Sequence, residues 1–96
     1  MSILKSINPA NEQMFAEFKQ MSLAKVKQII LESSKTQNQW AELDIQNRIQ
    51  IISKVKKMIL DNKRRYAETI TSEMGKPILE SIAEIEKCAS LCEYYE

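Results

Sequence analysis

A single glycine, Gly75, and the proline two residues after it constrain this chain more than any other feature. Glycine can adopt the left-handed backbone conformation that ends a helix, which other residues enter only at a cost in free energy. Proline suits the first position of a helix, where its missing N–H would have had no partner. Residues 71–77 therefore predict the end of one helix and the immediate start of another at Pro77.

Apolar side chains recur at helical spacing along most of the chain. The predicted helices span about residues 22–39, 44–61, 62–75 and 77–96. Ser22 and Asp44 are suited to cap the first two, and Trp40 is expected to close over the end of the first. In chain order, the expected apolar faces are Leu23, Val26, Ile29, Ile30 and Ser33; Ile45, Ile49, Ile52, Val55 and Ile59; Tyr66, Ala67, Ile70 and Met74; and Ile78, Ile82, Ile85, Ala89 and Cys92.

The first twenty residues have a different pattern. Residues 3–7 and 14–19 predict two short strands, and the polar residues 8–12 between them predict a turn. Two strands without a partner layer are marginal in water, so the hairpin implies contact with protein that this sequence does not include. The expected fold is mostly α with a short N-terminal β-hairpin, an α+β fragment. The helical pattern continues to Glu96 without a stop signal, which we interpret as truncation of a larger protein.

Composition restricts the possible partners. The 96 residues allow one small domain at most, and a net charge of +1 provides no overall attraction to nucleic acid or anionic lipid. The basic runs at residues 54–57 and 63–65 are interrupted by apolar residues at helical spacing, and no aromatic platforms for stacking bases accompany them, so they predict a solvated helix face. Nothing resembles a signal peptide or a membrane span, and we expect a cytoplasmic protein.

The residues needed for most kinds of catalysis are missing from this sequence. One glycine cannot form a Gly-x-Gly-x-x-Gly dinucleotide-binding turn, and the absence of histidine removes the commonest general base and metal ligand. Cys88 and Cys92 cannot complete a zinc site alone. Both also lie in the C-terminal half of their helix, where the helix dipole disfavours a thiolate. We expect two free, half-buried thiols and no catalytic residue.

Several segments resemble the aldehyde dehydrogenase superfamily, in particular its bacterial succinate-semialdehyde dehydrogenase branch. They are residues 7–11 (Ile-Asn-Pro-Ala-Asn), the spacing from Trp40 to Arg48, residues 73–77 (Glu-Met-Gly-Lys-Pro), Glu80, residues 83–89 (Ala-Glu-Ile-Glu-Lys-Cys-Ala) and residues 92–95 (Cys-Glu-Tyr-Tyr). The resemblance runs in register from about Ile7 to the last residue. It departs at Glu12, where the family usually has glycine. Glu12 would adopt a positive φ only reluctantly, so the turn is expected to be of another type or locally strained.

The resemblance implies a partial segment, residues 1–96, of the cofactor-binding domain of an NAD(P)+-dependent enzyme. Such enzymes oxidise an aldehyde through a thiohemiacetal on a cysteine, transfer hydride to NAD+ or NADP+, and hydrolyse the thioester with a glutamate as base. These groups lie downstream of the matched region in the family, so the fragment alone is expected to be inactive and to bind no cofactor. The implied partners are the remainder of an aldehyde dehydrogenase chain and further copies in a homo-oligomer.

The resemblance also implies a supporting role for a few residues of this chain. Some family members bind a monovalent cation through an acidic residue and a backbone carbonyl, at positions that correspond to Glu84 and roughly Ile7. The alternative is that Glu84 is exposed or forms a salt bridge. Tyr94 and Tyr95 correspond to positions near the substrate tunnel, although packing in a core or interface is the simpler interpretation.

A different class of function is a stand-alone helical interaction module without catalysis, whose apolar faces bind partner helices. Cooperative unfolding of a monomer or a defined oligomer would favour this module. Dye binding, aggregation or non-cooperative melting would favour a segment that has lost its neighbours.

Overall fold

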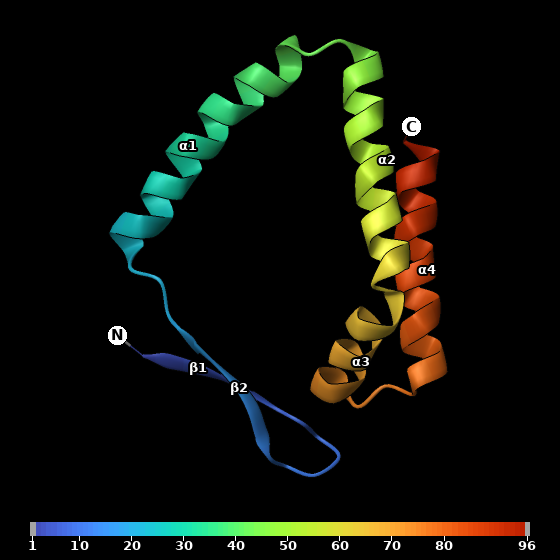
Figure 1. The fold of residues 1–96 in the computed structure, drawn as a ribbon. Coiled ribbons are helices and arrows are strands. Elements are labelled where there is room, and N and C mark those ends of the chain that lie inside the picture. Colours follow the sequence, from blue (N-terminus) through green and yellow to red (C-terminus); the bar gives the residue numbers. More distant parts are fainter. Residues whose placement is uncertain (1, 96) are drawn as a thin grey trace.

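The computed structural model describes residues 2–95. An antiparallel hairpin of β1 (Ile3–Ile7) and β2 (Met14–Lys19) comes first. It is followed by the helices α1 (Leu23–Glu42), α2 (Ile45–Asp61), α3 (Lys63–Met74) and α4 (Ile78–Tyr94). The prediction of a mostly helical fold with a short N-terminal hairpin is therefore confirmed over these residues (Figure 1).

The expected capping residues begin and end the helices. The Ser22 hydroxyl accepts a hydrogen bond from the Lys25 N–H at 3.2 Å, and the Asp44 carboxylate accepts one from the Asn47 N–H at 2.8 Å. Gly75 ends α3 with φ 71° and donates its N–H to the Thr71 carbonyl at 2.9 Å. These contacts satisfy backbone groups that the helix ends would otherwise leave without partners.

Two predicted helix ends differ from the structure, one by three residues and the other by one. α1 continues past Trp40 to Glu42, because no glycine or proline stops it and the backbone becomes extended only at Leu43. Pro77 caps α4 instead of occupying its first turn. Its ψ of 141° is extended, and its carbonyl already accepts hydrogen bonds from the N–H groups of Glu80 and Ser81.

The hairpin turn places Glu12 in the left-handed region, with φ 60°. Two asparagine side chains hold the turn: Asn8 accepts from the Ala10 N–H and Asn11 from the Gln13 N–H, each at 2.9 Å. The Glu12 N–H itself donates to the Asn8 carbonyl at 2.7 Å. The expected strain at Glu12 is therefore present, since a residue with a Cβ loses roughly 1–2 kcal/mol in this conformation.

α4 is the central helix of the packed part of the molecule. It lies antiparallel to α2, as Figure 1 shows, and it also packs against α3. Ion pairs join α4 to both neighbours, from Glu93 to Lys56 at 3.0 Å and from Glu86 to Lys63 at 3.1 Å. The fully or nearly buried residues are Ala67, Ser81, Ile85 and Ala89. Because three of these four are small, the helices can approach closely.

The rest of the molecule is open. α1 has no buried residue, and with the hairpin it extends away from α2 and α4 (Figure 1). The radius of gyration is 17.3 Å, whereas a compact chain of this length has about 12–13 Å. Parts of the predicted apolar faces are consequently uncovered. Met74, predicted to point inward, is 72% exposed because it lies in the last turn of α3, beyond the buried contact of Ala67.

Candidate functional site

The hairpin meets the helices at the turn between α3 and α4. The Ser6 hydroxyl donates to the Glu73 carboxylate at 3.1 Å, which ties β1 to the end of α3. Pro9 lies against Gly75, where an added Cβ would be 3.0 Å from the proline Cγ. Gly75 is therefore required both for its positive φ and for the close approach of the hairpin turn.

The two residues predicted to bind a cation are not joined by a hydrogen bond or ion pair within residues 2–95. The Glu84 carboxylate pairs with the Lys76 ammonium at 2.9 Å, and Ile7 lies in β1 with its side chain about half exposed. Among the described residues, no group of three or more His, Cys, Asp or Glu side chains could hold a metal ion. The Lys76 ammonium already neutralises Glu84, so a bound cation would have to displace or share this partner. The cation site stays a prediction.

Cys88 and Cys92 are free thiols, as expected. Cys92 is partly buried, but Cys88 is exposed, which makes the expectation of half-burial wrong for Cys88. Cys88 lies next to the buried Ile85 and Ala89 on α4, but it lines an open hollow between α3 and α4. Neither thiol belongs to a constellation of polar groups that we could recognise as catalytic.

A groove of about 760 Å³ lies between α3 and α4 and is called here the α3–α4 groove. Its apolar lining comes from Ile70, Met74, Ile85, Cys88, Leu91 and Tyr94. The Lys76–Glu84 ion pair and Lys87 supply its charged groups. With this lining, the groove can bind an apolar surface, and it offers no convergent set of polar groups for a reaction.

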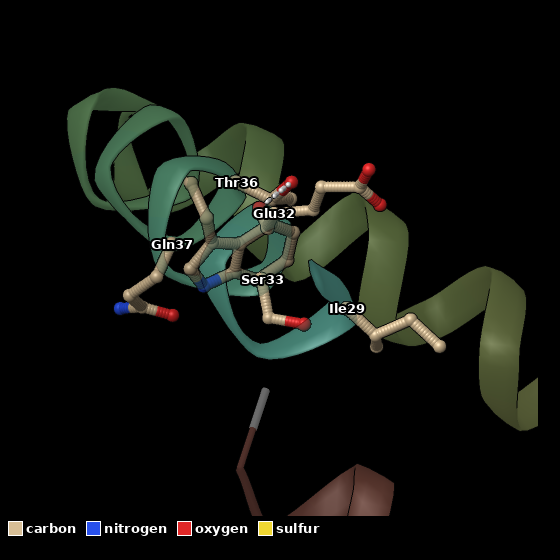
Figure 2. Close-up of a pocket in the computed structure, with 6 residues that line it drawn as sticks. Ile29, Glu32, Ser33, Thr36 and Gln37 are labelled. Atoms are coloured by element: carbon tan, nitrogen blue, oxygen red, sulfur yellow. Dashed lines mark hydrogen bonds between the residues drawn. The ribbon is translucent and has the colours of Figure 1, made fainter. Parts of the chain in front are cut away.

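A second hollow follows the polar half of α1 and has a volume of about 480 Å³. Figure 2 shows that Ile29, Glu32 and Gln37 point in different directions from a single helix. The Thr36 hydroxyl donates to the Glu32 carbonyl at 3.0 Å and is thereby used within the helix. Side chains that diverge from one helix cannot surround a ligand, so this surface is not a candidate site.

A third hollow, of about 320 Å³, contains one polar atom that sequence reasoning missed. Trp40, Ile49 and Tyr95 line this hollow together with Arg48, whose Nε is buried without a hydrogen-bond partner among residues 2–95. Tyr95 contacts Tyr94 edge to face at 5.0 Å between ring centroids. The spacing from Trp40 to Arg48, noted above only for its resemblance to a family, was the one signal that could have pointed here.

The basic runs form ion pairs on the helix surface. Lys57 pairs with Asp61 at 2.7 Å, and Arg64 with Glu68 at 3.0 Å, each one turn along the same helix. The hydrogen bond and the charge of Asp61 raise the pKa of Lys57 above its ordinary value of 10.5. Exposed pairs of this kind contribute little to stability. In residues 2–95, no helix has the length and apolar character that crossing a bilayer requires.

Comparison with known proteins gives a family match and several relatives of this chain. Residues 2–96 match the aldehyde dehydrogenase family. The chain is 29% identical over 90 residues to a succinate semialdehyde dehydrogenase [NAD(P)+] of Escherichia coli K12, covering 94% of this chain and 20% of the relative. It is 30% identical over 88 residues to a probable succinate-semialdehyde dehydrogenase [NADP(+)] of Sinorhizobium fredii, covering 92% and 18%.

A mammalian relative is more distant in sequence. The chain is 25% identical over 92 residues to the alpha-aminoadipic semialdehyde dehydrogenase of Rattus norvegicus, covering 96% of this chain and 17% of the relative. The chain thus spans only a fifth or less of the length of the relatives described here.

Proposed function

The chain belongs to the aldehyde dehydrogenase family, and we propose that it forms the N-terminal part of the cofactor-binding domain of an enzyme that oxidises an aldehyde to a carboxylate with NAD+ or NADP+. The observation that carries this proposal is the family match over residues 2–96. Succinate semialdehyde is the leading substrate, since two of the relatives described above are named for it. The assembled enzyme is proposed to be a cytoplasmic homo-oligomer.

The proposed role of this segment is structural. The sequence has no histidine and a single glycine, so the nucleophile, the base and the cofactor loop are proposed to come from elsewhere in the enzyme. We expect the 96-residue chain alone to oxidise no aldehyde. The cation site at Glu84 and the Ile7 carbonyl remains part of the proposal. Exchanging Na+ or K+ for a bulky organic cation should then lower the thermal midpoint of the assembled enzyme.

A chimera tests the proposed function. This chain replaces the segment of the Escherichia coli enzyme to which it aligns, and reduction of NAD(P)+ is followed with succinate semialdehyde as substrate. The chimera is expected to be active, whereas the 96-residue chain alone and the remainder of the E. coli enzyme alone are expected to be inactive. An inactive chimera, or turnover by the 96-residue chain alone that survives Cys88→Ser, would contradict the proposal.

The stand-alone helical module remains the competing proposal, because α2, α3 and α4 pack around a small core of their own. A sharp unfolding transition of a monomer that binds no hydrophobic dye would favour this module. Dye binding that is lost in the chimera would favour the segment of a larger enzyme.

A further inference from the structure

The chain exposes far more surface than its mass requires. Its accessible surface is 7931 Å², whereas a compact monomer of 11.1 kDa exposes about 5,700 Å². The difference, roughly 2,200 Å², is larger than the total area of a standard protein–protein interface, about 1,600 Å². The molecule therefore has enough uncovered surface for an extensive permanent interface.

This surface is apolar at several separate places. Large exposed apolar side chains lie on the hairpin (Ile3, Leu4, Phe18) and on α1 (Leu23, Ile30, Leu31). A third group lies in the α3–α4 groove, where Met74 is 72%, Leu91 58% and Tyr94 79% exposed. The apolar side chains of the groove come from two helices that pack against each other. Of the three groups of exposed apolar side chains, the one in the groove therefore has the best-defined geometry.

The distribution of these groups favours a large partner over a second copy. The hairpin and α1 extend away from α2 and α4 (Figure 1). A single partner that covers all three groups of apolar side chains must therefore be large enough to contact the molecule at three separate places. A two-fold dimer pairs one patch with itself and would leave the other groups uncovered. The relatives described above are about five times longer than this chain, and the part of them that it does not match is large enough to cover all three.

We infer that the α3–α4 groove is the docking surface for the remainder of an aldehyde dehydrogenase chain, which packs apolar side chains against Met74 and Leu91. This inference rests on the proposed function and adds to it the surface through which the segment joins the enzyme. The rim charges Lys76 and Glu84 already neutralise one another, so the occupant needs no strong charge of its own at that edge.

The test introduces a charge into the groove and, as a matched control, outside it. Leu91→Asp and Met74→Asp each place a carboxylate in the groove, and Met58→Asp places one on α2, where Met58 is 61% exposed and lines none of the hollows described above. All three positions are exposed, so the folded segment should tolerate each variant, which far-UV circular dichroism of the 96-residue chain checks. Burying an unpaired carboxylate on assembly should lower the yield of active chimera by roughly tenfold or more.

We expect Leu91→Asp and Met74→Asp to reduce the recovered chimera activity, while Met58→Asp leaves it within about twofold of the unsubstituted chimera. Equal activities for the groove variants and Met58→Asp would overturn the docking inference and leave the proposed function standing. An inactive unsubstituted chimera would instead contradict the proposed function. Sedimentation of the 96-residue chain is the second measurement, and a stable dimer that Leu91→Asp dissociates would assign the groove to a second copy and overturn the inference.

Discussion

Gly75 carries two structural requirements at one position. Its φ of 71° ends α3, and its missing Cβ leaves space for Pro9 of the hairpin turn. We predict that Gly75→Ala destabilises the packed helices by about 1–2 kcal/mol, because alanine is strained at this φ. Urea unfolding followed by circular dichroism measures this. Ser72→Ala, one turn earlier and within α3, is the control and should change stability by less than about 0.5 kcal/mol.

Lys57 provides a prediction with a defined pH dependence. Its hydrogen bond to Asp61 raises the pKa of the lysine above 10.5, so the pair stabilises the fold at all pH values below 10.5 at which Asp61 is charged. The stabilisation disappears as the pH rises through the raised pKa of the folded state. Lys57→Met should therefore lower the thermal midpoint slightly at pH 7, and the difference from wild type should vanish near pH 12. A difference that grows with pH would contradict this assignment.

Single residues also show what the sequence can and cannot specify. The caps Ser22 and Asp44 and the left-handed Gly75 were predictable, because each acts on backbone groups within a few residues of itself. Proline is compatible both with the cap of a helix and with its first helical position. The extended ψ of Pro77 places it at the cap of α4, and the sequence alone does not specify this ψ. The exposure of Met74 was not predictable either, since it depends on which elements cover the last turn of α3.

The elements differ in how much they depend on one another. Asp44 caps α2, which packs on α4, whereas Ser22 caps α1, which has no buried residue. We predict that Asp44→Ala lowers the free energy of unfolding of the packed helices by about 1 kcal/mol. Ser22→Ala should leave that transition unchanged and reduce only the helical signal of α1. Equal shifts of the urea midpoint for both variants would show that α1 is coupled to the other helices.

At this scale the sequence predicts the elements well and their packing poorly. Helical spacing marked the apolar face of α4, and Ile85 and Ala89 on it are buried as expected. The same spacing marked Leu23 and Ile30 on α1, which are exposed. Periodicity identifies the face that a helix can bury, but not whether a partner is present. The groove between α3 and α4 could not be predicted from the sequence either, because its shape depends on how the two helices pack against each other.

For the whole molecule, the open shape predicts an uneven sensitivity to proteolysis. Trypsin should cleave α1 at Lys25 and Lys35 before it cleaves α4 at Lys87, because α4 packs on two helices and α1 has no buried residue. Mass spectrometry of a limited digest should therefore show an early product that retains residues 45–94. In the active chimera, cleavage within α1 should slow. Equal rates at Lys35 and Lys87 in the isolated chain would contradict the open arrangement.

The order of the packed helices along the chain has a consequence for synthesis. α2, α3 and α4 are consecutive, and each contacts a helix next to it or one helix away in sequence. Contacts between neighbours in sequence close short loops and form fast. As the polypeptide leaves the ribosome, these three helices can therefore pack together first and form a folded surface for later segments to bind. The hairpin and α1 become covered only when the surface that they contact has been synthesised and folded.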